Sequence, residues 1–255
     1  MLKLKDKVAI VTGAGAGIGK AIAQIFAEQG SKVIVSDINP ERVQGTVNAI
    51  RVLGNEATGI VTNMAVKEQV EELITYSIDT YGSLDVLVNN AGVMDNFQPV
   101  GEVDDNTWKR VMSVNVDGPF YAMRKAIQYF LKRGTGNIIN ICSIGGLKGG
   151  VAGAAYTTSK HALVGLTKSA GYLYAQSGIR CNGIAPGAVE TRIVETIDMT
   201  HIPPLAQNRI MPGMVLNPRS GQPEEIAQVA LFLASEDSGF VNGHILVADG
   251  GWSVY

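Results

Sequence analysis

The sequence predicts an α/β protein with one doubly wound parallel sheet of about seven strands, helices on both faces, and a single domain. Short apolar runs rich in β-branched residues alternate with longer segments in which apolar residues recur every three or four positions. The first pattern is typical of buried parallel strands, and the second of helices that pack on one face. No linker, low-complexity tract or internal repeat interrupts the alternation. An unbroken succession of this kind predicts one sheet in one domain.

Turn residues mark where the predicted elements begin and end. Pro40 suits the first turn of a helix, while Gly30, Gly54 and Gly82 stand where helices commonly end in a left-handed cap. The predicted strands are 8–11, 32–36, 57–62, 84–88, 137–143, 179–185 and 245–248. The predicted helices begin with the apolar stripe 18–26 and continue with 40–53, 66–81, 105–133, 156–175 and a last one opened by Pro223. We expect the helix over 105–133 to be bent or broken near Asp117-Gly118-Pro119.

The composition argues against several classes of function. A net charge of −2 offers no electrostatic footprint for nucleic acid or an anionic membrane. No apolar run approaches the roughly 18 residues of a membrane span, and the first residues enter the first strand without a signal-like region. Cys142 and Cys181 fall in predicted strands, which indicates reduced core residues of a cytoplasmic protein. The three histidines are scattered, so we expect no metal site.

Residues 7–37 have the layout of a dinucleotide-binding site: strand, glycine-rich turn, helix, strand and terminal acid. Glycines let the backbone approach a pyrophosphate, which the amide groups and dipole of the helix N-terminus stabilise. Asp37, about 20 residues beyond the turn, is placed to accept hydrogen bonds from the adenosine ribose and would repel a 2′-phosphate. NAD is therefore favoured over NADP, although Lys20 and Arg42 leave that preference open. A glycine-rich loop without a ligand is the alternative, because the strict G-x-G-x-x-G pattern is absent.

Three asparagine positions are candidates for the same site. Asn89-Asn90-Ala91-Gly92 follows the fourth predicted strand, at the edge where open α/β sheets bind ligands. It could also be only a turn, since Asn and Gly tolerate left-handed backbone. Asn63 directly follows the third predicted strand, at the same edge of the sheet. Asn115 lies between two valines of the long helix, and by itself it is better interpreted as a surface or capping residue.

Tyr156 and Lys160 lie one helical turn apart, which places a phenol and an ammonium group on one helix face. A tyrosine with a pKa of about 10 is a poor base, but a close ammonium and a positive nicotinamide ring both favour phenolate. Bringing that pKa to about 7 requires roughly 4 kcal/mol. Tyr121 and Lys125 share the spacing, and we interpret them as helix surface or a subunit contact. Only Tyr156 follows a strand-end hydroxyl, Ser143, although a lone Ser143 would be interpreted as a turn cap.

In order and spacing, these motifs resemble the short-chain dehydrogenase/reductase family over essentially the whole chain. The matching motifs are Thr12-Gly13-x-x-x-Gly17-Ile18-Gly19, Asn89-Asn90-Ala91-Gly92, Asn115, Ser143, Tyr156-x-x-x-Lys160 and Pro186-Gly187. The resemblance implies a Rossmann-like fold and hydride transfer between a substrate carbon and nicotinamide. It implies cofactor contacts from Gly13, Gly17, Ile18, Gly19, Asp37, Asn63, Met64, Asn90, Ala91, Gly92, Tyr156, Lys160, Pro186, Gly187, Val189 and Thr191.

The resemblance also implies a role for each catalytic candidate. Tyr156 is the expected general acid or base, and Lys160 is expected to lower its pKa and hold the nicotinamide ribose. Ser143 is expected to hydrogen-bond the substrate oxygen, and Asn115 to hold a water that passes the proton to solvent. The family usually has an Asp near the adenine where Asn63 stands, so we expect a weakened contact there.

Residues 188–221 show no clean period, and we interpret them as a substrate-binding lid. The alternative is a disordered surface loop, but eight sizeable apolar residues are too many for comfortable exposure. Their make-up suits an uncharged, partly apolar substrate in a water-poor site. The eight are Ile193, Ile197, Met199, Ile202, Leu205, Ile210, Met211 and Met214.

The expected function is an NAD(H)-dependent oxidoreductase that interconverts a secondary alcohol and a ketone on a small molecule. A 3-oxoacyl-[acyl-carrier-protein] reductase using NADPH is the alternative; Asp37 opposes it, as does the absence of arginine from 172–177. A non-enzymatic nucleotide-binding protein is disfavoured, because binding alone needs neither Tyr156 nor Ser143. The resemblance also implies a homotetramer or homodimer.

Overall fold

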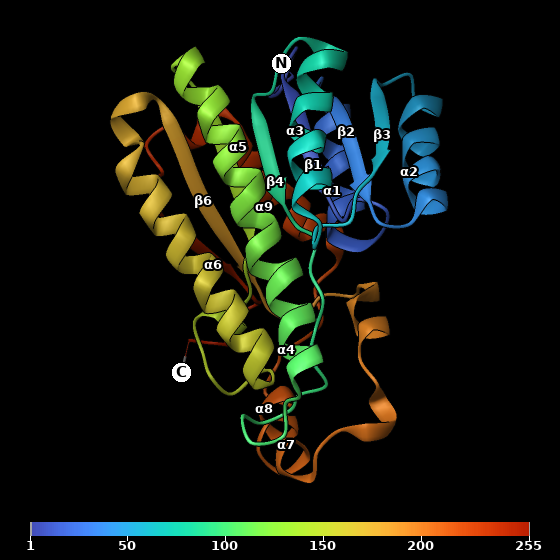
Figure 1. Ribbon diagram of the computed structural model, residues 1–255, viewed down its shortest axis with the longest axis vertical. Helices are drawn as coiled ribbons and strands as arrows, with labels where there is room; N and C mark the ends of the chain where they lie inside the picture. The colour runs from blue at the N-terminus through green and yellow to red at the C-terminus, as the bar shows by residue number, and fades with distance from the viewer. Residues whose placement is uncertain (1, 255) are drawn as a thin grey trace.

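The computed structural model describes residues 2–254, and within them seven parallel strands form one sheet in the order β3-β2-β1-β4-β5-β6-β7. This arrangement confirms the predicted doubly wound fold and single domain (Figure 1). The strands are β1 (Val8–Thr12), β2 (Lys32–Asp37), β3 (Ala57–Val61), β4 (Val86–Asn89), β5 (Gly136–Ile141), β6 (Ile179–Pro186) and β7 (Ile245–Ala248). The fifth strand ends two residues earlier than predicted, so Cys142 and Ser143 lie just beyond it.

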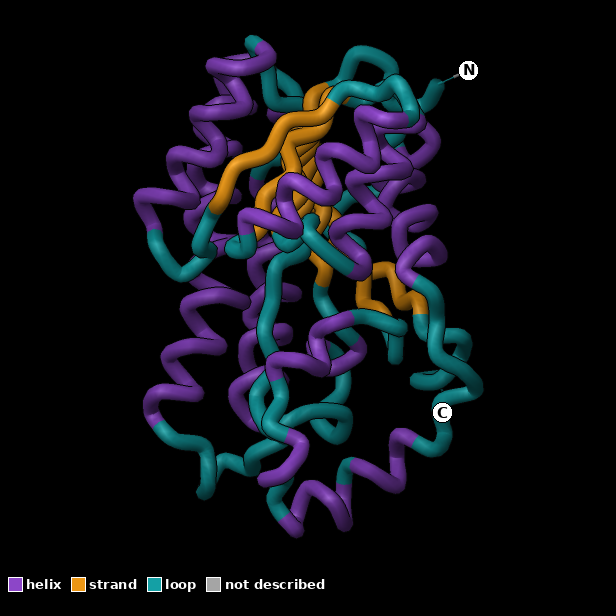
Figure 2. The backbone as a smooth tube through the Cα atoms, turned by 90° about the vertical axis from the view of Figure 1, so that its right-hand side faces the viewer, coloured by secondary structure: helices purple, strands orange, loops and turns teal. Residues whose placement is uncertain are grey.

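Helices cover both faces of the sheet, as Figure 2 shows with the sheet seen between two helical layers. One apolar core joins the sheet to α1 (Gly17–Glu28), α2 (Pro40–Val52) and α9 (Pro223–Ala234). The core on the opposite face contains residues of α3 (Lys67–Tyr81), α5 (Gly118–Arg133) and α6 (Ala154–Leu173). Two buried faces explain why all five residues of β1 are apolar or hydrogen-bonded and fully enclosed.

The order of the strands places a crevice in the middle of the sheet. From β1 the chain passes outward through β2 and β3, then returns to β4 on the other side of β1. The connections after β1 and β4 therefore leave in opposite directions and open a crevice at the carboxyl ends of these strands. Open α/β sheets bind ligands at this point, and the predicted site residues lie there.

The long helix predicted over 105–133 consists of α4 (Asp105–Met112), a π-helical turn (Ser113–Asp117) and α5. The irregularity ends at Asp117, next to the predicted break, and Pro119 stands in the first turn of α5, where proline is tolerated. A π-helical turn inserts an extra residue, and such turns are frequent at functional sites. Here the turn contains Asn115.

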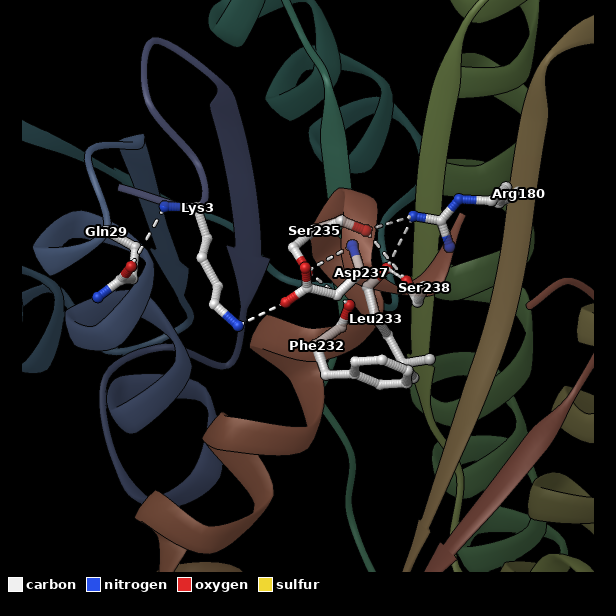
Figure 3. Close-up of polar contacts among 8 residues, drawn as sticks. All are labelled: Lys3, Gln29, Arg180, Phe232, Leu233, Ser235, Asp237 and Ser238. Atoms are coloured by element: carbon white, nitrogen blue, oxygen red, sulfur yellow. Dashed lines mark hydrogen bonds and ion pairs between the residues drawn. The ribbon is translucent and has the colours of Figure 1, made fainter. Parts of the chain in front are cut away.

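Polar contacts hold the C-terminal end of α9 near the amino ends of the strands, away from the crevice (Figure 3). Arg180, near the amino end of β6, donates from Nη2 to the carbonyls of Leu233 (3.0 Å) and Ser235 (3.2 Å). Lys3 forms an ion pair with Asp237, and both side chains are about half exposed, so this pair adds little stability. The carbonyls at the helix end are thereby satisfied without using any residue of the crevice.

The segment 188–221 forms a separate flap beside the crevice. It contains the short helices Arg192–Thr196, Met199–His201, α7 (Pro204–Arg209) and α8 (Met211–Met214), of which α7 and α8 lie at the lower end of Figure 1. An isolated bridge between Val189 and Gly221 joins its two ends, so the flap begins and ends at one point of the body. None of the helices described in residues 2–254 has the length and apolar character needed to cross a membrane.

Candidate active site

A cavity of about 580 Å³ lies in the crevice at the carboxyl ends of the central strands. Of the predicted cofactor contacts, all but Gly19 line it, and so do Ser143, Tyr156 and Lys160 of the predicted catalytic set. The cavity therefore gathers residues from positions 13 to 252 of the chain. Asn115 lies behind its wall and is 1% exposed.

The glycines of the turn are required where its backbone packs closely against other parts of the chain. The Gly15 amide donates to Asp37 Oδ2 (3.0 Å), and a Cβ on Gly15 would lie only 2.8 Å from that oxygen. Gly19 is buried beneath the turn, where a Cβ would lie 2.3 Å from the Gly13 carbonyl oxygen. Gly15 therefore packs against Asp37, and it is Ala16 of the turn that lines the cavity although it was missing from the predicted contacts. Gly19 thus shapes the turn, and Gly13 and Gly17 line the cavity.

Asn90 holds the glycine turn against the fourth strand. Its amide donates from Nδ2 to the carbonyls of Thr12 (2.8 Å) and Gly13 (3.1 Å). The backbone amides of Asn90 and Ala91 in turn donate to Thr12 Oγ1, at 3.0 and 3.1 Å. Asn89-Asn90-Ala91-Gly92 is therefore more than a turn, because it ties the carboxyl ends of β1 and β4 together. Thr12 is a site-building residue that the predicted contacts omitted.

One end of the cavity has the polar groups that suit an adenosine. Thr62 lines it with a buried hydroxyl that has no hydrogen-bond partner within the described residues. A buried, unpaired hydroxyl facing a cavity is satisfied when a ligand supplies the partner. Asn63 lines the same end, but its Oδ1 already accepts from the Ala65 amide (3.0 Å). That bond leaves Asn63 Oδ1 less free to accept from a ligand, and Thr62 is a further cavity residue that the predicted contacts omitted.

Asp37 and Arg42 meet at this end of the cavity. Asp37 Oδ1 accepts from the Asn39 amide (3.0 Å), so both carboxylate oxygens are held by backbone while the side chain lines the cavity. Arg42 pairs with Glu195 of the flap, with Nη2 and Oε2 3.3 Å apart, and not with Asp37. Glu195 also accepts from Arg192 (2.6 Å). Arg42, one of the two cations that left the choice between NAD and NADP open, is therefore partly neutralised by Glu195 of the flap.

The Tyr156 hydroxyl lies near that of Ser143, whose Oγ accepts from the Gly145 amide (3.0 Å). Tyr156 is 7% exposed, and burial raises the pKa of its phenol to about 12, an effect that the nearby Ser143 hydroxyl partly opposes. The charge of Asp95 raises this pKa further. The sequence argument for a lowered pKa counted two cations, but among the groups of the chain itself burial dominates.

Lys160 lies directly behind the tyrosine. Its Nζ is 5.6 Å from the centre of the Tyr156 ring and donates to the Ile141 carbonyl (2.9 Å). Because the side chain is 3% exposed, burial lowers the pKa of Lys160 to about 8. A buried ammonium with one carbonyl partner is a donor that a ligand hydroxyl could also engage.

Asn115 is buried, which corrects the interpretation of this residue, taken alone, as a surface or capping Asn. Its Nδ2 donates to the Val93 carbonyl (2.9 Å) and to Ser159 Oγ (3.0 Å), while Oδ1 accepts from the Val93 amide (2.9 Å). A Cβ on Gly92 would lie 3.4 Å from Asn115 Oδ1 and 3.6 Å from Lys160 Nζ. Asn115 and Lys160 therefore lie on either side of Gly92. Both amide hydrogens of Asn115 are engaged, so a water held there would bond to other atoms.

The second Tyr–Lys pair of the sequence lies outside the cavity. Tyr121 and Lys125 are on α5, and neither is among the residues that line the cavity. In residues 2–254, no group of three or more His, Cys, Asp or Glu side chains could hold a metal ion. Cys142 and Cys181 are buried free thiols.

The flap supplies the apolar wall of the cavity. Ile193, Ile197 and Met214 line it, whereas Leu205 is 55% exposed and the side chain of Met199 lies outside the described part of the chain. Trp252 closes the wall from the C-terminal segment, and its indole N–H donates to the Gly213 carbonyl (3.1 Å).

Comparison with known proteins agrees with this geometry. A family model described as enoyl-(acyl carrier protein) reductase matches residues 13–253. The 3beta-hydroxysteroid dehydrogenase 2 of Eggerthella lenta is 41% identical over 253 residues, which cover 99% of this chain and 96% of that protein. The cyclohexanol dehydrogenase of an Acinetobacter species is 38% identical over 254 residues (98% and 96%). A solved structure from Beutenbergia cavernae with bound NADP is 33% identical, covers 100% and 99% of the two chains and has a TM-score of 0.88.

The chain therefore belongs to the short-chain dehydrogenase/reductase family. It is an NAD(P)-dependent oxidoreductase of the class that acts on alcohols and ketones.

Proposed function

We propose that the enzyme uses NAD(H) to interconvert a secondary alcohol on a compact, largely apolar ring with the corresponding ketone. The observation that carries this proposal is that Ser143, Tyr156 and Lys160 line one cavity together with Asp37, with Lys160 Nζ 5.6 Å from the centre of the Tyr156 ring. The apolar wall suits a ring with few polar groups, and two relatives are named for a hydroxysteroid and for cyclohexanol.

Each catalytic side chain has one task in this proposal. When bound, the nicotinamide accepts or supplies the hydride. Tyr156 takes the proton from the substrate hydroxyl during oxidation and returns it during reduction. Ser143 donates a hydrogen bond to the substrate oxygen and stabilises its developing negative charge. Lys160 favours the phenolate of Tyr156 and offers a donor to the nicotinamide ribose. Asn115 holds the loop that faces Lys160.

The preference for NAD rests on charge at the adenosine end. The carboxylate of Asp37 lines the cavity and would repel a 2′-phosphate, while Arg42 is engaged by Glu195. The remaining predicted contacts, from Pro186 to Thr191, also line the cavity, and we propose that they bind the carboxamide of the nicotinamide.

We assign residues 188–221 the role of a substrate lid. The Val189–Gly221 bridge provides a common base for the lid, and Ile193, Ile197 and Met214 face the cavity. The 3-oxoacyl-[acyl-carrier-protein] reductase alternative remains disfavoured by Asp37 and by the arginine-free end of α6. NADPH-dependent reduction of an acyl thioester by the purified enzyme, faster than any alcohol oxidation, would establish it instead.

We further propose a cytoplasmic homotetramer or homodimer. Large apolar side chains are exposed on the end of α6 and beside the edge strand β7, namely Tyr172, Leu173, Phe240 and Val247. Exposed apolar patches commonly mark contacts between copies. A monomeric mass in solution would remove this part of the proposal, and cell fractionation tests the location, which rests on the two reduced thiols.

The decisive experiment is a screen for NADH formation over linear and cyclic secondary alcohols, with NADP alongside. Tyr156→Phe should abolish turnover and leave NAD binding nearly intact, because the ring stays and only the proton donor is lost. Tyr121→Phe is the matched control, since Tyr121 has Lys125 at the same spacing but lies outside the cavity. Equal turnover in Tyr156→Phe and the parent would refute the assignment.

A further inference from the structure

A fully buried carboxylate, Asp95, lies at the start of the helix that carries Tyr156. It is 0% exposed, and its Oδ1 accepts from the amides of Phe97 (3.1 Å) and Gly153 (3.2 Å). Its Oδ2 accepts from the amide of Tyr156 itself (2.9 Å), and the Ala155 amide is a further donor. All of these partners donate and so favour the ionised carboxylate, against the burial that raises the pKa of Asp95.

These donors include the first amides of α6, which have no partner within the helix. The Ala154 amide donates to the Gln98 carbonyl (2.9 Å), so one loop, residues 93–98, satisfies the start of the helix. A Cβ on Gly153 would lie 2.5 Å from Asp95 Oδ2, so the close approach of the carboxylate requires glycine at this position. Tyr156 is the third residue of α6, within the turn that Asp95 holds.

The same loop reaches the lid. The Met94 amide donates to Thr196 Oγ1 (3.0 Å), and Asn96 Oδ1 accepts from the Asp198 amide (2.9 Å). Met94 and Phe97 also line the cavity. Loop 93–98 therefore contacts the lid on one side and, through Asp95, the catalytic helix on the other.

We infer that Asp95 is a positioning residue of the active site, which fixes the first turn of α6 so that the Tyr156 hydroxyl meets Ser143 and the substrate oxygen. The inference rests on the proposed role of Tyr156. Asp95 also belongs to the charges around that phenol, together with Lys160 of α6 and the Cys142 thiol beyond β5. Removing its charge lowers the pKa of Tyr156, in addition to loosening the turn.

The test uses Asp95→Asn, which keeps the size of the side chain but replaces one acceptor by a donor. We expect kcat to fall about tenfold, as for a lost helix cap, with NAD affinity nearly unchanged. The pH midpoint of alcohol oxidation should move to lower pH by about half a unit or more. Gly153→Ala is the second variant, since it keeps the charge and displaces the carboxylate; its kcat should fall too.

Hydrogen–deuterium exchange of the cofactor-free protein supplies a measurement that does not depend on turnover. Amides 153–157 should exchange faster in Asp95→Asn and Gly153→Ala, and amides 165–173 at the parent rate. Asp85→Asn is the matched control. Asp85 also accepts a backbone amide, that of Val8 (2.8 Å), with its side chain 12% exposed, but at the opposite edge of the sheet. The Asp85→Asn variant should have a lower melting temperature and the same pH midpoint of alcohol oxidation as the parent.

The inference is overturned if Asp95→Asn keeps the kcat and pH midpoint of the parent, or if Asp85→Asn moves the midpoint equally. Unchanged exchange at 153–157 overturns it as well, whether or not a substrate has been found. A parent enzyme that oxidises no alcohol, or a fully active Tyr156→Phe, counts against the proposed function instead.

Discussion

Replacing the buried Lys160 by methionine should change how stability depends on pH. Burial lowers the pKa of this lysine from 10.5 to about 8, so the folded protein disfavours its ammonium form. That fall of about 2.5 pH units corresponds to about 3 kcal/mol at pH 7, where both the folded and the unfolded lysine are protonated. Between pH 8 and 10.5 the unfolded chain binds more protons than the folded one, so this cost shrinks as pH rises.

The assay is urea unfolding of the cofactor-free parent and Lys160→Met at pH 7 and pH 9. The free energy of unfolding of the parent should rise by about 1 kcal/mol relative to the variant over this interval. The variant also loses the hydrogen bond to the Ile141 carbonyl, but this loss is the same at both pH values and cancels. Lys168→Met, at an exposed position of the same helix, is the control and should run parallel to the parent. Parallel curves for Lys160→Met would refute the reasoning.

Three further predictions concern the two ends of the cavity. Asp37→Ala should weaken NAD binding about tenfold or more, through the loss of hydrogen bonds to a charged group, and relax discrimination against NADP; an unmoved ratio of the two dissociation constants would contradict the ribose role. Glu195→Gln should raise the use of NADP relative to NAD several-fold by freeing Arg42, and adding Arg42→Gln should cancel the gain. Trp252→Phe should speed proteolysis within 192–217 and raise KM, because the indole no longer holds the Gly213 carbonyl; parent-like cleavage and KM would show that the lid does not need this bond.

The sheet, and the convergence of the site residues at one edge of it, could be predicted because their sequence signals are local. Each strand is a short apolar run with a polar or glycine residue at its carboxyl end, and parallel strands bring those ends to one edge. Gly13, Asn90, Ser143 and Pro186 therefore meet at one cavity, although up to 173 residues separate them.

The features of the site that could not be predicted depend on contacts between segments far apart in the sequence. Asn115 is flanked by valines, and nothing near it in the chain shows that Val93 and Ser159 would satisfy its amide in the core. Asp95 follows an irregular loop, and its partners lie 58 and 61 residues further on. Burial is the largest cause of the raised pKa of Tyr156, and burial is a property of the assembled cavity.

Burial acts in opposite directions on the pKa values of the catalytic pair, raising that of Tyr156 to about 12 and lowering that of Lys160 to about 8. Both shifts favour the uncharged forms. Without a bound cofactor, the protein therefore keeps the Tyr156 phenol neutral and makes the Lys160 ammonium easier to deprotonate. Lowering the phenol pKa from about 12 to about 7 takes about 7 kcal/mol, well above the roughly 4 kcal/mol expected from the sequence. One positive charge about 4 Å away supplies about 4 kcal/mol at an effective dielectric constant near 20. A single cation is therefore too weak, and the charge of Lys160 must act together with that of an oxidised nicotinamide ring. It follows that Lys160→Met should abolish alcohol oxidation nearly as completely as Tyr156→Phe, and that the double variant should be no worse than either.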